Sequence, residues 1–216
     1  MNILLPLDAA AFDAAAAPLR LESLLPGAAG AVIAGAGGKA FFERFSGAPE
    51  RTDGRPDPLD RYTARTVAAA VSAALMGSGV RHAIAHPFGV DPVIPFQRLG
   101  RAAGLGGPGP LALQIHPEFG PWWAYRALVV LDRRLPAVAA PGDACAGCPA
   151  PCVAACPAGA VAAGGFDVRA CHARRLAAVA CHESCAARLA CIRGPEHRYG
   201  EEQLAFHMRA SMPRPA

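Results

Sequence analysis

Residues 145–157, "CAGCPAPCVAACP", contain four cysteines and end in a proline, whereas no cysteine occurs anywhere before them. Four more cysteines follow, at positions 171, 181, 185 and 191. Clustered thiols of this kind bind zinc, form disulfides or hold an iron–sulfur cluster. The intervals between the cysteines help to separate these alternatives, and they raise the question of what the long cysteine-free part of the chain does.

The intervals fit an iron–sulfur cluster better than zinc. Structural zinc sites usually take four ligands from two Cys-x2-Cys hooks that lie a dozen or more residues apart. This stretch has one hook, Cys145 and Cys148, followed by two intervals of three residues. Bacterial ferredoxins use the run C-x2-C-x2-C-x3-C-P, whose fourth cysteine binds the other of two [4Fe-4S] clusters. The stretch follows that order with one extra residue in the second interval, and Pro157 follows its last cysteine.

Eight cysteines match the eight iron corners of two such clusters. The crossed pattern assigns to the first cluster Cys145, Cys148, Cys152 and Cys191, and to the second Cys156, Cys171, Cys181 and Cys185. Two alternatives stay open, namely one cluster with zinc or spare thiols, and a structural zinc or disulfide module. Because cysteines fill every corner, we do not expect a histidine ligand from His172, His182 or His197.

Five arginines lie close to these cysteines in the sequence. They are either solvated residues on helix faces, or one or two of them raise the potential of a cluster or form a docking face for an acidic redox partner. The five are Arg169, Arg174, Arg175, Arg188 and Arg193.

The composition bears on compartment and partners. No basic residue precedes Arg20, which is unlike a secretory or transit peptide, and no apolar run reaches the roughly 18 residues that span a bilayer. We therefore expect a cytoplasmic protein without a membrane span, and a reducing compartment favours metal binding over disulfides. The formal charge of +4 would be offset by two clusters of about −2 each. Without a run of basic residues, no nucleic-acid partner is expected.

Upstream of the cysteines, the sequence predicts an α+β domain over residues 1–140, followed by a ferredoxin-like module over 141–216. Hydrophobic periodicity and Gly/Pro breaks predict strands at 31–35, 81–88, 111–120 and 123–136. Helices are expected at 8–23, 57–79, 95–107 and 201–212, the second capped by Asp57.

Polar and aromatic side chains are dense in "IHPEFGPWWAYR", residues 115–126. Loops between strands often carry binding sites, so this segment is a candidate lining for a pocket that takes a flat cofactor. The alternative is that the tryptophans cap the sheet and that His116 bonds a loop carbonyl. The candidate cofactor-binding residues are His116, Glu118, Trp123, Tyr125 and Arg126.

Three stretches in this order resemble the epoxyqueuosine reductase family: "RAAGLGGPGPLALQIHPEFGPWWAYRALVVLDRRLP", "CAGCPAPCVAACPAGAV", and "RAC" with the last three cysteines. That family is related to reductive dehalogenases and, more distantly, to a human cobalamin-processing protein. The resemblance, over roughly residues 80–195, implies a reduced nitroreductase-like mixed sheet that binds cobalamin and receives electrons from a 2[4Fe-4S] ferredoxin-like module. It adds Gly104 and Gly106 to the cofactor-binding candidates, and it places Asp91, in "GVDPVIPF", near the family's catalytic aspartate.

The chain also departs from that family. Ile192 stands where the family usually has proline after the last cluster cysteine, the spacing around Asp91 is imperfect, and the helical repeats that help hold tRNA are not found. Epoxide reduction on tRNA is therefore not carried over to this truncated member. The first hypothesis is an iron–sulfur oxidoreductase that passes electrons, from a flavoprotein or ferredoxin-type donor, to a bound corrinoid. The alternatives are a dicluster electron carrier with no cofactor upstream, and a structural or regulatory iron–sulfur module.

Overall fold

The computed structural model describes residues 1–105, 107–136 and 142–212. The chain divides into two compact units, which we call the sheet unit and the cysteine unit. The sheet unit comprises residues 1–106 and 123–142, and the cysteine unit comprises 107–122 and 143–216. The segment 107–122, which sequence reasoning placed in the first domain, thus groups with the cysteines.

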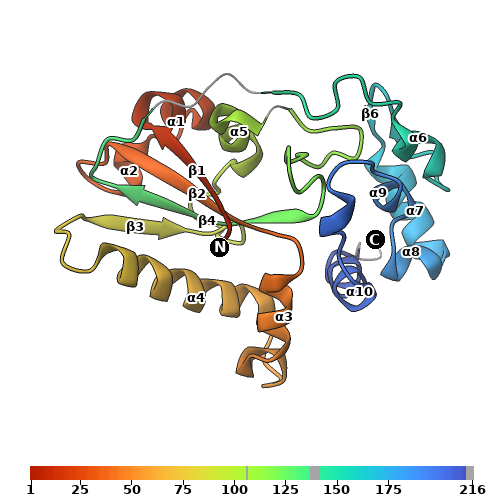
Figure 1. Cartoon of the computed structure of the whole chain (residues 1–216), viewed down its shortest axis with the longest axis horizontal. Coiled ribbons are helices and arrows are strands. Elements are labelled where there is room, and N and C mark those ends of the chain that lie inside the picture. Colours follow the sequence, from red (N-terminus) through yellow and green to blue (C-terminus); the bar gives the residue numbers. More distant parts are fainter. Residues whose placement is uncertain (106, 137–141, 213–216) are drawn as a thin grey trace. The chain divides into compact units, whose positions relative to one another are not determined.

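The sheet unit is built on four antiparallel strands in the order β1-β2-β4-β3 (Figure 1). They are β1 (Ile3–Asp8), β2 (Gly30–Gly37), β3 (His82–Ala85) and β4 (Trp123–Leu131). The expectation of a mixed sheet was wrong for the described residues, since every pair is antiparallel. The reason is that β4 lies between β2 and β3, which run in the same direction and would otherwise form a parallel pair.

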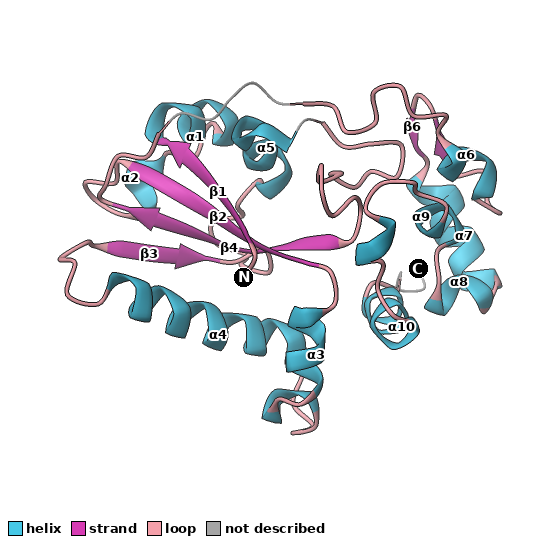
Figure 2. Cartoon of the chain, in the orientation of Figure 1, coloured by secondary structure: helices cyan, strands magenta, loops and turns pink. Residues whose placement is uncertain are grey.

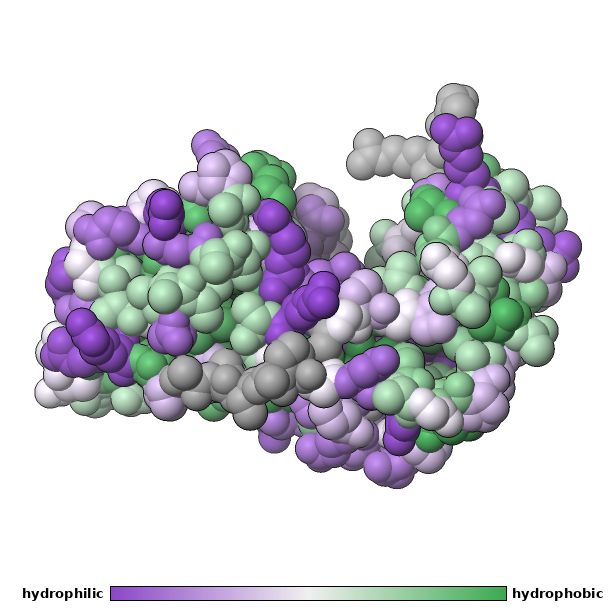
Figure 3. All heavy atoms as spheres, turned by 90° about the horizontal axis from the view of Figure 1, so that it is seen from above, coloured by the Kyte–Doolittle hydropathy of each residue, from purple (hydrophilic) through white to green (hydrophobic). Residues whose placement is uncertain are grey.

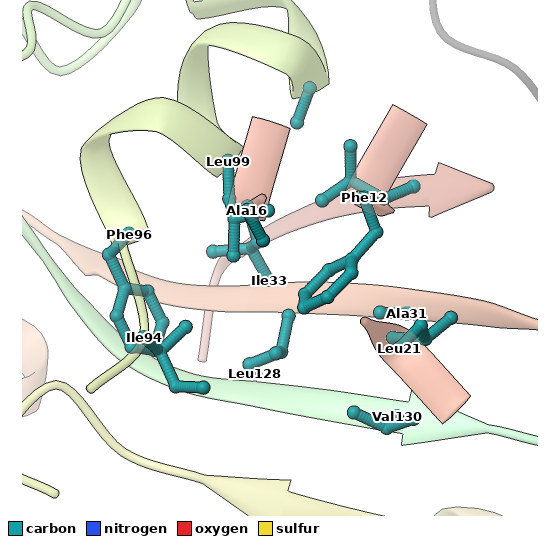
Figure 4. Close-up of a cluster of buried hydrophobic side chains, with 12 residues drawn as sticks. Phe12, Ala16, Leu21, Ala31, Ile33, Ile94, Phe96, Leu99, Leu128 and Val130 are labelled. Carbon is teal, nitrogen blue, oxygen red and sulfur yellow. The ribbon is translucent and has the colours of Figure 1, made fainter. Parts of the chain in front are cut away.

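The two faces of this sheet bury different helices, because successive side chains of a strand point to opposite faces. Ile33, Leu128 and Val130 pack on one face against α1 (Ala9–Ala16), α2 (Leu21–Leu24) and α5 (Phe96–Gly100), as Figure 4 shows. On the other face, Ala34 and Ala127 pack against Val67 of α4 (Pro58–Leu75). The sheet unit therefore has its own core, which contains no cysteine.

Most predicted elements of this unit are confirmed, including β2, β3, β4 and the long helix α4 (Figure 2). The helix expected at 8–23 is instead two short helices, and the strand β1 before them was missed. The expected cap at Asp57 was also wrong, because Asp57 has a left-handed backbone (φ 51°) and its side chain makes no capping hydrogen bond. The remaining elements of the unit are α3 (Ala40–Ser46), the 3-10 turn η1 (Pro49–Arg51) and the π-turn η2 (Arg101–Leu105).

The cysteine unit consists of short helices and one two-stranded ribbon. Two small apolar clusters lie inside it, one of Leu111, Cys152, Val161 and Ala187, the other around Trp122, Tyr199 and Leu204. Its elements are α6 (Pro151–Ala155), β5 (Val161–Ala162), β6 (Gly165–Phe166), α7 (Val168–Ala177), α8 (Ala180–Glu183), α9 (Ala186–Leu189), η3 (Pro195–His197) and α10 (Glu201–Ala210).

The C-terminal helix expected at 201–212 is confirmed as α10, but the strand expected at 111–120 was wrong. That segment forms only two isolated bridges, Pro108 with Gln114 and His116 with Gly120. Ala112 and Gly120 both have positive φ, which breaks an extended strand.

Hydrophilic and hydrophobic residues are interspersed over the visible face of each unit (Figure 3). Among the described residues, no helix combines the length and the apolar content that a bilayer crossing requires.

A candidate metal centre of eight cysteines

All eight cysteines are free thiols in the cysteine unit. Cys152 and Cys191 are buried, and the other six are half-buried. No disulfide joins them, so each sulfur remains available as a ligand.

Four of these thiols surround one cavity. Cys145, Cys148, Cys152 and the distant Cys191 line it, and we call them the first thiol set. Leu111, Ile115 and Arg193 contribute to the same walls, and the cavity volume is about 130 Å³. Since a single buried water needs about 10–15 Å³ on a comparable measure, the cavity has room for a group of several atoms.

The other four thiols form a second thiol set around Cys171. The Cys171 thiol interacts electrostatically with those of Cys185, Cys156 and Cys181. Cys156 therefore lies with the second set, although it belongs to the same short run as Cys145, Cys148 and Cys152. The first thiol set thus shares one cavity, and the thiols of the second set act on Cys171, while Cys156 and Cys185 also pack in the apolar cluster that contains Cys152.

Three of the thiols, those of Cys145, Cys152 and Cys171, lie where a negative charge is costly. Burial raises the pKa of Cys145, and the charges of Asp143, Cys148, Cys191 and Cys152 raise it further. Burial and Cys191 likewise raise the pKa of Cys152. Burial also raises the pKa of Cys171, and the Arg175 guanidinium opposes that rise. Gathered thiolates of this kind need a positively charged partner, which a metal core supplies.

The backbone between Cys145 and Cys156 is folded by two left-handed residues and one short helix. Left-handed residues at Gly147 (φ 68°) and Ala150 (φ 52°) fold the loop after Cys145 back on itself. The Ala150 amide donates to Cys148 Sγ at 3.4 Å. Pro151 then begins α6, and Cys156 ends it in an extended conformation, so the chain leaves the helix at that residue. Cys152 of the first set therefore lies within α6, and Cys156 of the second set lies directly after it.

The chemistry and the space around the first set both fit an iron–sulfur cluster. The donors are sulfur atoms, and a backbone amide already points at one of them. A Cβ built on Gly109 would lie only 2.9 Å from Cys145 Sγ, so this position has no room for a side chain. In the described part of the chain, no three His, Cys, Asp or Glu side chains converge in a way that would hold one metal ion. The thiols instead border a shared cavity, as a polynuclear group requires.

A tight backbone contact fixes the segment that carries Cys191. Residues 116–120 form a turn in which His116 Nδ1 accepts from the amides of Glu118 and Phe119. A Cβ on Gly120 would lie 2.1 Å from the Arg193 carbonyl oxygen, and one on Gly194 would lie 2.5 Å from the Phe119 carbonyl carbon. The sequence analysis did not single out these two glycines. In "HPEFG" and "CIRG", the only indication of a close backbone contact is the residue type glycine itself. They let the turn approach the chain just after the last cysteine.

The candidate cofactor residues upstream belong to two different units. His116 and Glu118 belong to the cysteine unit, and Trp123, Tyr125 and Arg126 belong to β4 of the sheet unit. The ring of Trp123 packs edge-on against Tyr125, with centroids 4.5 Å apart. Gly104 has φ 93° within the π-turn, and Gly106 lies outside the described residues.

Tyr125 and Arg126 point to opposite faces, as successive residues of a strand do, and a β-bulge places Arg126 on the same face as Ala127. In the register between β2 and β4, Ala34 pairs with Ala127 and Gly35 with Tyr125, so Arg126 is the extra residue. Tyr125 packs against Phe96 on the α5 face. Arg126 lies on the α4 face, with its Cζ 4.5 Å from the ring centre of Phe41. These two residues therefore do not line one pocket.

Asp91 lines a cavity of about 290 Å³ in the sheet unit, together with His86 and Phe88. The His86 ring stacks on Phe88, and its Nδ1 is 2.9 Å from the Arg126 carbonyl oxygen. Pockets for drug-sized ligands start at roughly 300 Å³. A corrinoid is larger than such ligands, so this cavity does not fit it.

Solved structures with the same fold are epoxyqueuosine reductases. A selenomethionine-labelled enzyme of this name superposes with a TM-score of 0.61 and 13% identity, over 92% of this chain and 63% of the other. The enzyme from Streptococcus thermophilus gives 0.58 and 12%, over 90% and 62%. A third, solved with an epoxyqueuosine-modified tRNA stem loop, gives 0.59 and 13%, over 94% and 64%. The chain has the epoxyqueuosine reductase fold.

This likeness confirms the α+β class, and at such low identity it speaks for the fold alone. The chain spans less than two thirds of the length of those enzymes. No family model matches the sequence, and no curated protein matches it either.

Proposed function

We propose that this chain is an iron–sulfur redox protein that carries electrons through two [4Fe-4S] clusters. The first thiol set would hold one cluster and the second set the other, with four thiolates each. The observation that supports this most is the division of eight thiols into four and four, in which Cys191 joins the first run and Cys156 leaves it. When bound, each cluster supplies a site that accepts and releases one electron.

The residues of α6 would set the path between the two sites. Cys152 lies in α6 and Cys156 directly follows this helix, so the two are four residues apart, which is about one helical turn or about 6 Å of rise. Cys152 belongs to the first set and Cys156 to the second. A single turn of backbone therefore joins the ligand shells, and this favours rapid exchange of electrons between them.

The surroundings of the proposed function follow from its chemistry. Free thiols need a reducing compartment, so a cytoplasmic location is part of the proposal. A flavoprotein or a ferredoxin-type protein would supply the electrons. No feature of the sequence calls for a nucleic-acid partner or a membrane.

A second candidate is that the electrons reduce a corrinoid bound by this chain. The likeness to epoxyqueuosine reductases, which extends over both units, favours it. The Asp91 cavity is too small for the macrocycle, however, and we derive no step through it. The simpler alternative is a dicluster carrier whose sheet unit holds no cofactor.

The primary test is anaerobic purification or reconstitution of the full chain. About eight iron and eight sulfide per chain are expected, with visible absorbance that dithionite bleaches. A preparation that takes up only zinc would refute the proposal. Single Cys→Ser variants sharpen the test, because their electron paramagnetic resonance spectra should fall into two classes, each with one magnetically isolated cluster. Cys191→Ser should behave like Cys145→Ser, and Cys156→Ser like Cys171→Ser.

Titration of the iron-loaded protein with hydroxocobalamin separates the second candidate from the carrier. A red complex that survives gel filtration and has a shifted visible spectrum would support corrinoid binding. In that case Asp91→Asn and Trp123→Ala should weaken binding while the iron content stays normal. If a large excess of cobalamin causes no spectral shift, corrinoid binding is refuted and the dicluster carrier is the function that remains.

A further inference from the structure

Three arginines of the cysteine unit, Arg175, Arg188 and Arg193, have a buried Nε with no hydrogen-bond partner within the described residues, and two of them lie beside a thiol set. Arg193 lines the cavity of the first set. Arg175 follows Cys171 by four residues on α7, which places both on one helix face. The charge of Arg175 acts on the Cys171 thiol.

The guanidinium of Arg175 is deeply buried, and in the described part of the chain no carboxylate pairs with it. Only 8% of the residue is exposed. Its terminal nitrogens donate to the Met208 and Ser211 carbonyl oxygens, near the C-terminal end of α10. Carbonyls at a helix C-terminus offer only a partial negative charge. A buried cation without a full counter-charge is costly, so the second thiol set is the negative partner that remains for it.

Arg188 shows what a purely structural arginine looks like in the same unit. Its Cζ lies 5.0 Å from the ring centre of Trp122 and 4.8 Å from that of Tyr199. It also donates to the Pro121 carbonyl oxygen at 2.5 Å. Aromatic faces and a carbonyl therefore compensate its charge, although its Nε is also unpartnered, and Arg188 is not among the residues that line the cavity of the first set.

We propose that Arg193 and Arg175 each direct the Nε–H toward a sulfur of the adjacent cluster and so raise the reduction potential of that cluster. The proposal rests on the proposed function. Four thiolates around a core of about +2 leave a net charge near −2, which becomes more negative on reduction. A neighbouring cation and a donated hydrogen bond both favour the reduced form, because it carries more negative charge. Each arginine is thus a positioning and tuning residue for its own cluster.

The test is a redox titration of the full iron-loaded chain, followed by electron paramagnetic resonance. Arg193→Met and Arg175→Met should each lower one of the two cluster potentials, and not the same one. The reduced-to-oxidised ratio at a fixed potential should fall at least tenfold, which is about 59 mV for a one-electron couple. Arg174→Met is the matched control, because it removes an equal charge from the exposed neighbour of Arg175 and should leave both potentials in place.

A second measurement does not depend on how the methionine variants fold. Wild-type protein labelled with ¹⁵N-guanidino arginine should show weak nitrogen hyperfine couplings to both reduced clusters. Arg193→Lys and Arg175→Lys should each abolish one coupling, because lysine keeps the charge but has no Nε–H at this position. Full iron content without such couplings overturns the proposal, and so do Met variants that shift neither potential or the same potential. Wild-type protein that binds no iron would instead refute the proposed function itself.

Discussion

Replacement of Gly120 by alanine should cost the cysteine unit both stability and its first cluster. A left-handed backbone costs a non-glycine residue roughly 1–2 kcal/mol, and Gly120 has φ +57°. The added Cβ would also lie 2.1 Å from the Arg193 carbonyl oxygen, more than 1 Å inside the usual carbon–oxygen contact of about 3.3–3.6 Å. Forced overpacking of this kind costs about 1–3 kcal/mol. The total is about 2–5 kcal/mol, a large share of the 5–15 kcal/mol that stabilises a typical domain.

Gly159→Ala is the matched control for this variant. Gly159 also lies in the cysteine unit with φ +61°, but a Cβ there meets no atom within 4 Å. It should therefore cost only the backbone term, about 1–2 kcal/mol. For a unit of this size each kcal/mol lowers the melting temperature by about 4–8 °C. Gly120→Ala should melt at least about 4 °C below Gly159→Ala and bind about half the iron, since Cys191 lies two residues before the displaced Arg193. Equal melting temperatures and equal iron in the two variants would refute the reasoning.

Three further outcomes are expected. Gly109→Ala should prevent the first cluster from forming and spare the second, because its Cβ would lie 2.9 Å from Cys145 Sγ; Gly107→Ala, with nothing within 4 Å, is the control, and iron analysis with electron paramagnetic resonance tells them apart. Burial and the charge of Asp57 raise the pKa of Asp60, so its carboxylate disfavours the folded state at neutral pH. Asp60→Asn should raise the melting temperature at pH 7, and the gain should vanish below about pH 4, where the acid is protonated in both states; a constant gain across this range would contradict that cause. Removal of iron by an oxidant and a chelator should abolish hydrogen-exchange protection in α6–α9 and leave β2 and β4 protected, because the sheet core contains no cysteine. Equal loss of protection in both units would contradict this expectation.

The elements of the sheet unit were predictable wherever a strand or helix has a clear local pattern of apolar residues. The apolar run at 31–35 and the Val- and Leu-rich run after Trp123 gave β2 and β4, and the i+4 repeat of apolar residues in 58–75 gave α4. Strand β1 was missed, and it contains Pro6, a residue that is uncommon within strands. Proline is tolerated there because β1 is at the edge of the sheet.

The order of the strands was not predictable from local signals. β4 pairs with both β2 and β3, and this pairing is decided by burial of whole faces rather than by any one residue. The bulge at Arg126 likewise depends on the partner strand. It shifts the alternation of side chains by one residue, so that Arg126 lies on the same face as Ala127.

The eight cysteines are a different case, because their spacing carries information about chemistry rather than about chain direction. Sequence intervals suggested a crossed grouping, and Cys191 lines one cavity with Cys145, Cys148 and Cys152. What the intervals could not reveal is how Cys191 reaches the first run. That depends on the close approach of the turn 116–120 to Arg193 and Gly194, which are far from it in sequence.

The small core of the cysteine unit connects its stability to its chemistry. Its buried apolar clusters contain only a few side chains, and one of them includes Cys152. The core of the sheet unit buries twelve residues in one cluster (Figure 4). Domains with few buried apolar groups usually depend on metals or disulfides for stability. No disulfide is present. The clusters proposed to carry electrons at the two thiol sets would therefore also stabilise this unit. A variant that loses a cluster should therefore lose local structure as well, and loss of electron transfer alone, with folding intact, is expected only from changes outside the ligand shells such as Arg193→Met and Arg175→Met.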